Sequence, residues 1–166
     1  MPRDAAKVFR LEQARLVADV FERHGVEYLF IGKGGAILLG YPGATQDVDV
    51  FPRRSEANGR RIVQALKELG FTLSRGDERD VVSGKDFVQI GNGPFDLDLV
   101  FAPDGIESFD AALRNAERID NFPVMSIGDI IASKRAAGRK RDLVELPLLE
   151  EFRKVYEAAK ARRGGN

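Results

Sequence analysis

The chain contains no cysteine among its 166 residues. That absence excludes disulfide bonds, thiolate metal sites and a cysteine nucleophile. Its one histidine, His24, has no neighbour that indicates a histidine-based catalytic triad. No apolar run approaches the roughly 18 residues needed to cross a bilayer, and the charged start Met1-Pro2-Arg3-Asp4 lacks the apolar core of a signal peptide. We therefore expect a soluble cytoplasmic protein without membrane partners.

The chain also lacks net charge, because 26 basic residues balance 26 acidic ones. A neutral molecule has no overall field that attracts nucleic acid, and we expect no recognition of a DNA sequence. The distribution is nevertheless uneven. The segment from Lys134 onward carries ten basic and five acidic residues, a net charge of +5. Either a solvated helical face or a nucleic-acid-binding patch would account for this excess.

Hydrophobic periodicity predicts a mixed α/β fold. The predicted helices cover residues 5–23, 36–39, 56–69, 108–115, 126–137 and 143–161. The predicted strands cover residues 27–31, 47–51, 71–73, 81–90 and 95–101, with an extended piece at 122–125. The turn at 91–94 indicates a hairpin between the last two strands. This length suits one domain, residues 1–166, with a helical C-terminal part over about 126–161.

Asp47 and Asp49 lie two residues apart in a predicted strand. Because alternate residues of a strand project to one face, both carboxylates point the same way. Adjacent carboxylates repel each other, and a divalent cation such as Mg²⁺ or Mn²⁺ removes that cost. Two such ions about 4 Å apart can stabilise the attacking and leaving oxygens of phosphoryl transfer. The alternative is that the pair faces solvent on an amphipathic strand.

A second pair, Asp96 and Asp98, lies in another predicted strand. Aspartate is depleted in strands, so two strands with paired aspartates are hard to explain as surface decoration. If the two strands are neighbours in the sheet, three carboxylates can meet on one face. The residues alone leave open whether Asp96 or Asp98 would be the third.

The glycine-rich segment Gly32-Lys33-Gly34-Gly35 lies between a predicted strand and a predicted helix. Glycines let the backbone approach a phosphate closely, and a helix N-terminus supplies free N–H groups and the positive end of the helix dipole. Lys33 can add a charge to a phosphate oxygen. The alternative is a tight turn with a surface lysine. The segment matches neither a Walker A motif nor the dinucleotide-binding fingerprint.

The order of glycine turn, short helix, Gly40, second turn and Thr45-Gln46-Asp47-Val48-Asp49 resembles the nucleotidyltransferase superfamily that includes DNA polymerase beta. It looks most like the small bacterial branch of AbiEii-type toxins and minimal nucleotidyltransferases. The match has no gap over residues 28–51 and continues more loosely through 97–99, 105–111 and 129–142. The resemblance implies a nucleotidyltransferase fold, which is a small, mixed, twisted sheet with helices packed mainly on one face.

The resemblance also implies roles for matching residues. Asp47, Asp49 and Asp98 would be the catalytic residues and would hold Mg²⁺ or Mn²⁺, with Asp98 as the third carboxylate because its flanking residues resemble the family's third strand. Lys33 departs from the family, whose turn usually has Ser or Gly at that position. The remaining nucleotide-binding residues implied are Gly32, Lys33, Gly34, Thr45, Lys134 and Arg139.

The expected activity is Mg²⁺-dependent transfer of a nucleotidyl group from an NTP to an acceptor hydroxyl. The resemblance favours tRNA or a protein as acceptor, in a toxin-like system with a cognate antitoxin. Two alternatives remain open. One is a catalytically inactive nucleotide- or protein-binding module of the same fold, and the other is a small antibiotic nucleotidyltransferase.

Overall fold

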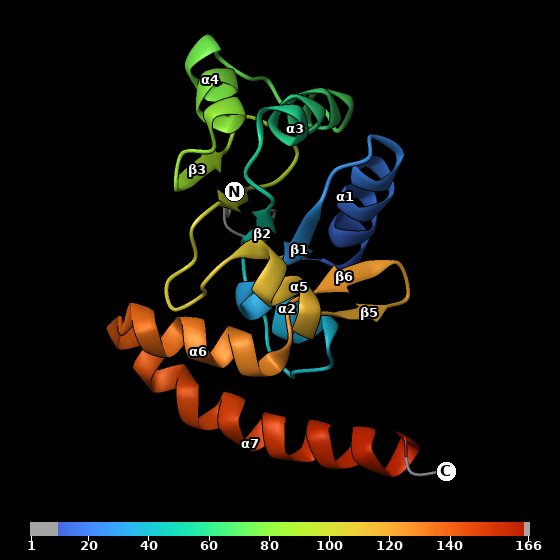
Figure 1. The fold of residues 1–166 in the computed structure, drawn as a ribbon, viewed down its shortest axis with the longest axis vertical. Helices are drawn as coiled ribbons and strands as arrows, with labels where there is room; N and C mark the ends of the chain where they lie inside the picture. Colours follow the sequence, from blue (N-terminus) through green and yellow to red (C-terminus); the bar gives the residue numbers. More distant parts are fainter. Residues whose placement is uncertain (1–9, 165–166) are drawn as a thin grey trace, which may run out of the picture.

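The computed structural model describes residues 10–164, in which helices and strands alternate along the chain. The helices are α1 (Leu11–Arg23), α2 (Gly32–Leu38), α3 (Glu56–Glu68), α4 (Arg75–Ser83), α5 (Phe109–Asn115), α6 (Ile127–Ala137) and α7 (Lys140–Gly164). The strands are β1 (Tyr28–Phe30), β2 (Val48–Pro52), β3 (Phe87–Ile90), β4 (Leu97–Val100), β5 (Glu117–Ile119) and β6 (Phe122–Val124). Figure 1 shows the sheet between the α3–α4 pair at one end and the α6–α7 pair at the other.

The six strands form one sheet in the order β3-β4-β2-β1-β6-β5. The pairs β2–β4 and β1–β6 are parallel, whereas β1–β2, β3–β4 and β5–β6 are antiparallel. The predicted mixed α/β fold is therefore confirmed. The turn at 91–94 joins β3 to β4 as an antiparallel hairpin, and β4 pairs on its other side with β2.

Strand alternation divides the sheet into two faces. Tyr28 and Phe30 belong to one face, and the ring of Tyr28 packs edge-on against Phe21 of α1 at a centroid distance of 4.9 Å. The opposite face carries Phe51, whose ring packs edge-on against Phe109 of α5 at 5.3 Å. Helix α1 therefore packs against one face of this mixed sheet and α5 against the other.

The region after α3 differs from the predicted elements. Residues 75–83 form α4 because Ser74 and Asp77 cap its first turn with reciprocal hydrogen bonds of 3.0 Å. Gly84 ends this helix in the left-handed region at φ 72°. The predicted strand 81–90 is thus a strand only over its last residues, in β3. The predicted strand 71–73 is irregular, and β5 is an additional strand that the sequence pattern did not indicate.

The predicted helices on the two sides of this region are confirmed in outline. α3 begins after the cap Ser55, and α5 begins after the cap Ser108. The predicted helix 5–23 is confirmed from Leu11 onward, and its first residues, 5–9, lie outside the described part of the chain. Asn58 of α3, fully buried, joins β1 to β2, since its amide donates to the carbonyls of residues 27 and 53 at 3.0 and 2.8 Å.

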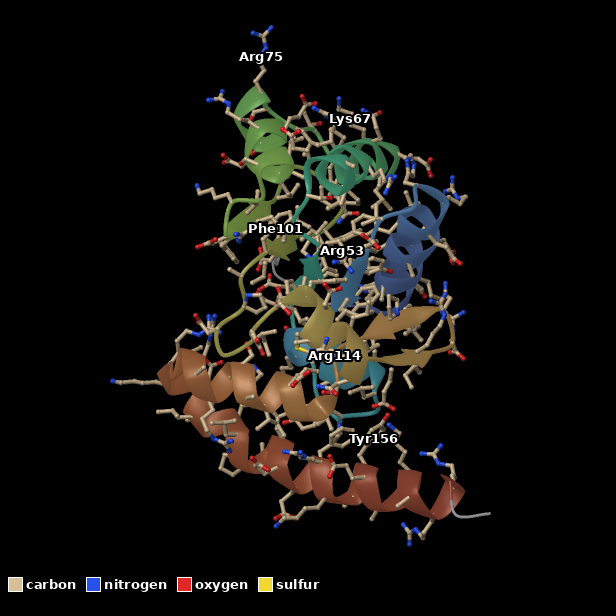
Figure 2. The ribbon with its side chains drawn as sticks, in the orientation of Figure 1. Arg53, Lys67, Arg75, Phe101, Arg114 and Tyr156 are labelled. Carbon is tan, nitrogen blue, oxygen red and sulfur yellow. The ribbon has the colours of Figure 1, made fainter. Side chains whose placement is uncertain are left out.

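The C-terminal part is helical, as predicted, and its two helices pack against each other. Two tyrosines connect this part to the rest of the molecule. Tyr156 of α7 donates a hydrogen bond to Glu117 of β5 at 2.9 Å (Figure 2), and Tyr41 donates to Glu145 of α7 at 3.0 Å. Within residues 10–164, no helix combines the length and the apolar character that a membrane span requires.

Candidate functional site

The sheet brings three of the predicted carboxylates together. Asp49 of β2 stands directly opposite Asp98 of β4 in the parallel pair, so both side chains project to one face. Asp47 immediately precedes β2. One carboxylate oxygen from each of these residues lies within 4.8 Å of the other two. The three side chains, called here the carboxylate triad, have the spacing of ligands to a shared cation.

Asp96 lies one residue before β4 and is not a member of this group. Its backbone carbonyl accepts a hydrogen bond from the Val48 N–H at 3.2 Å and so extends the pairing of the two strands. Both aspartates were candidates for the third carboxylate. The structure places Asp98, and not Asp96, beside Asp49.

Two of the triad carboxylates each have one buried oxygen that no protein group satisfies. One oxygen of Asp49 and one of Asp98 have no hydrogen-bond partner, although buried polar atoms normally have one. Burial and the neighbouring charge of Asp49 raise the pKa of Asp98 to about 7. Burial likewise raises the pKa of Asp49. A divalent cation that accepts oxygen ligands fits this donor set, because it would satisfy both oxygens and offset the repulsion.

Gly32 lies against the triad. Its φ of 67° is in the left-handed region, and a Cβ at this position would lie 2.7 Å from Oδ2 of Asp49. Only glycine meets both the conformational and the steric requirement without strain. Gly32 therefore leaves free the space that the Asp49 carboxylate occupies, beside any role toward a ligand.

The glycine-rich segment itself is not a loop before a helix, because α2 begins at Gly32 and not at Ala36. Gly34 and Gly35 are buried in its first turn. A Cβ on Gly35 would lie 3.1 Å from the carbonyl oxygen of Phe30, so this glycine lets α2 approach the end of β1 closely. The glycines predicted to cradle phosphate thus serve, in part, close packing of helix against strand.

The structure does not bring Lys33 to the triad. Its Nζ lies 3.2 Å from Oε1 of Glu145 in α7, and Tyr41 donates its hydrogen bond to the same oxygen. Lys33, Gly34 and Thr45 do not line the cavity at the triad. Three of the residues predicted to bind nucleotide therefore lie away from it.

The triad lines a cavity of about 480 Å³. The cavity is bounded by Gly32, by residues 102–104 after β4 and by one side of α6. Phe87, Val100, Met125, Ile130 and Ala137 give it apolar walls, and Ser133 contributes a hydroxyl-bearing side chain. It is large enough for part of a nucleotide or a small acceptor.

Lys134 and Arg139, which the family resemblance implies as nucleotide-binding residues, line the same cavity. Both cations bind Asp142, whose side chain is 1% exposed: Lys134 Nζ lies 3.6 Å from Oδ1, and Arg139 Nε lies 2.7 Å from Oδ2. Burial raises the pKa of Asp142, but the hydrogen bond and charge of Arg139 and the charge of Lys134 outweigh it, so the pKa is lowered. The cavity thus has an acidic side at the triad and a basic side at the α6–α7 junction.

Sequence reasoning missed Ser133, Arg141 and Asp142 as cavity or supporting residues. The segment Arg139-Lys140-Arg141-Asp142 was visible as a mixed-charge cluster. Periodicity could not tell which of its members would be buried, because the cluster lies at the junction of two helices.

Comparison with known proteins supports the fold. No family model matches the chain, and no curated protein is similar to it in sequence. The crystal structure of the lincosamide antibiotic adenylyltransferase LnuA, with lincomycin bound, is similar, with a TM-score of 0.56 and 13% identity over 85% of this chain and 96% of that one. TM1012 of Thermotoga maritima, assigned as a nucleotidyltransferase, has a TM-score of 0.49 and 14% identity over 89% and 92%. The likeness to LnuA shows that this chain has the nucleotidyltransferase fold.

Proposed function

We propose that this protein is a metal-dependent nucleotidyltransferase that transfers a nucleotidyl group from an NTP to an acceptor hydroxyl. The observation that carries the proposal is the carboxylate triad. Asp47, Asp49 and Asp98 converge at a cavity, two of them with buried oxygens that lack a partner. The fold shared with an adenylyltransferase supports the same reaction class. The proposal includes Mg²⁺ or Mn²⁺ as the ion that these three residues hold.

In the proposed reaction the acceptor oxygen attacks the α-phosphorus of the NTP, and the bond to the diphosphate breaks. Asp98 is our candidate for taking the proton from the acceptor hydroxyl, because its side chain lines the cavity and burial beside Asp49 raises its pKa to about 7. Asp47 and Asp49 orient the reacting groups. When bound, divalent cations supply neutralisation of the phosphate charge.

The acceptor is any hydroxyl compound that can reach the triad through the cavity. The resemblance favours tRNA or protein, and the name of LnuA adds lincosamides as a class to assay. The neutral charge of the whole chain weakens the case for tRNA. We therefore choose the acceptor by experiment, with all three classes tested in parallel.

The test is label transfer from each α-³²P-labelled NTP with Mg²⁺ or Mn²⁺, in the presence of tRNA, cell protein or a lincosamide. We expect one combination to give a labelled product. Asp49→Ala and Asp98→Ala should abolish the label while circular dichroism shows an intact fold. Asp96→Ala is the matched control and should retain transfer. If the wild type neither binds an NTP nor transfers label, the proposal is wrong.

A further inference from the structure

The basic side of the cavity contains three cationic side chains: Lys134 in the last turn of α6, Arg139 between the helices and Arg141 in the first turn of α7. They differ in what they already bind. Asp142 binds both Lys134 and Arg139. Within residues 10–164, the side chain of Arg141 makes no hydrogen bond and no ion pair.

The geometry of the helix explains this difference. Consecutive helical residues point about 100° apart, so Asp142 can turn into the protein while Arg141 stays at the surface of the cavity. Asp142 is buried and Arg141 is exposed. A buried carboxylate that loses its cationic partners is strongly destabilised. Lys134 and Arg139 are therefore held in place by a partner that the fold cannot easily release.

We infer that Arg141, rather than the paired Lys134 and Arg139, binds the diphosphate part of the NTP that leaves in the reaction. This inference rests on the proposed function. A guanidinium group offers a planar fork that matches phosphate oxygens in two parallel hydrogen bonds. Arg141 has this fork available, on the wall of the cavity that also contains the triad.

Lys134 and Arg139 then have a structural role and not a phosphate-binding one. Asp142 offsets one of their two positive charges and already occupies both side chains, which leaves them less available to a phosphate. Together with Asp142 they fix the α6–α7 junction and hence the position from which Arg141 reaches the cavity. The family resemblance assigns phosphate contact to Lys134 and Arg139, and the ion pairs move that assignment to their unpaired neighbour.

The experiment compares Arg141→Gln with Lys140→Gln. Lys140 is the adjacent residue, is also exposed, loses the same charge and does not line the cavity. Calorimetric titration with Mg²⁺ measures binding of a non-hydrolysable nucleoside triphosphate and of the matching monophosphate. We expect Arg141→Gln to weaken triphosphate binding about 10- to 100-fold, which is the range for a lost hydrogen bond to a charged group.

The monophosphate and the control variant should be almost unaffected, and thermal unfolding should be the same for all three proteins. Equal triphosphate binding by Arg141→Gln and wild type would overturn the inference while leaving the proposed function in place. An equal loss in Lys140→Gln would also overturn it, since only general charge would then matter. A wild type that binds no triphosphate would refute the proposed function together with the inference.

Discussion

Asp98 is a residue whose environment opposes its charge. It is 8% exposed, stands opposite Asp49 and has one oxygen without a hydrogen-bond partner. In the metal-free protein Asp98→Asn removes the repulsion and gives Asp49 an amide donor. We expect the free energy of unfolding at pH 8 to rise by about 1–3 kcal/mol, measured by urea denaturation with a chelator present.

The same variant should respond differently to metal. Addition of Mg²⁺ should stabilise the wild type and leave Asp98→Asn almost unchanged, because a ligand that binds only the folded state stabilises it. A variant less stable than the wild type in chelator would show that Asp98 contributes to folding and not to a cation site.

Gly32 offers a second test at single-residue scale. Gly32→Ala adds a Cβ at a left-handed φ and within 2.7 Å of Asp49 Oδ2. Gly25→Ala is the matched control, because its φ of 70° is similar and its nearest atom lies 3.9 Å away on Arg61. We expect both variants to lose about 1–2 kcal/mol of stability from backbone strain. Only Gly32→Ala should also abolish label transfer, and equal activity of the two variants would contradict the role of Gly32 at the triad.

At the scale of elements, the α6–α7 junction depends on Asp142. The folded-state pKa of this residue is lowered from an ordinary value of about 4. Its ion pairs therefore contribute stability above about pH 4 and lose that contribution as the pH falls through the folded-state pKa. We expect Asp142→Asn to lose about 2 kcal/mol at pH 7, less than for a fully buried pair because Arg139 is 56% exposed.

Urea unfolding of wild type and Asp142→Asn at pH 7 and in acid measures this dependence. The difference between the two proteins should shrink as the pH falls below about 4. A difference that stays constant over that range would mean that the ion pairs contribute no stability.

The ion pair between Lys33 of α2 and Glu145 of α7 allows a test of what Lys33 does. Because Lys33 binds Glu145, Lys33→Gln should lower stability by about 0.5 kcal/mol. Its triphosphate affinity should change less than that of Arg141→Gln in the same calorimetric titration. A larger loss for Lys33→Gln would show that Lys33 leaves Glu145 to bind phosphate, as the sequence suggested.

The elements that the sequence predicted well share two signals. α3 and α6 combine an apolar face with a serine cap, and both follow their predicted ranges closely. α4 has one buried residue, Val81, so it lacks the apolar face that periodicity detects. Its capping pair, Ser74 and Asp77, was the available signal. The start of α2 was missed because its glycines resemble a turn, and only packing against β1 explains them as helix.

At the scale of the whole molecule, the triad depends on topology. Strand alternation predicts that Asp47 and Asp49 share a face, and family resemblance favours Asp98 over Asp96. Neither reveals that β4 lies beside β2 and parallel to it, because this pairing joins two strands that are far apart in the sequence. The basic side was less predictable still, since the burial of Asp142 decides which cations remain unpaired.

The central claim, that the triad binds a divalent cation together with a nucleotide, is tested most directly by Mn²⁺ binding. The electron paramagnetic resonance signal of free Mn²⁺ is followed while wild type, Asp49→Ala or Asp96→Ala is added with a non-hydrolysable NTP. We expect wild type and Asp96→Ala to deplete the signal beyond what the nucleotide alone does, and Asp49→Ala not to do so. Equal depletion by Asp49→Ala, or none by the wild type, would show that the triad does not bind the cation.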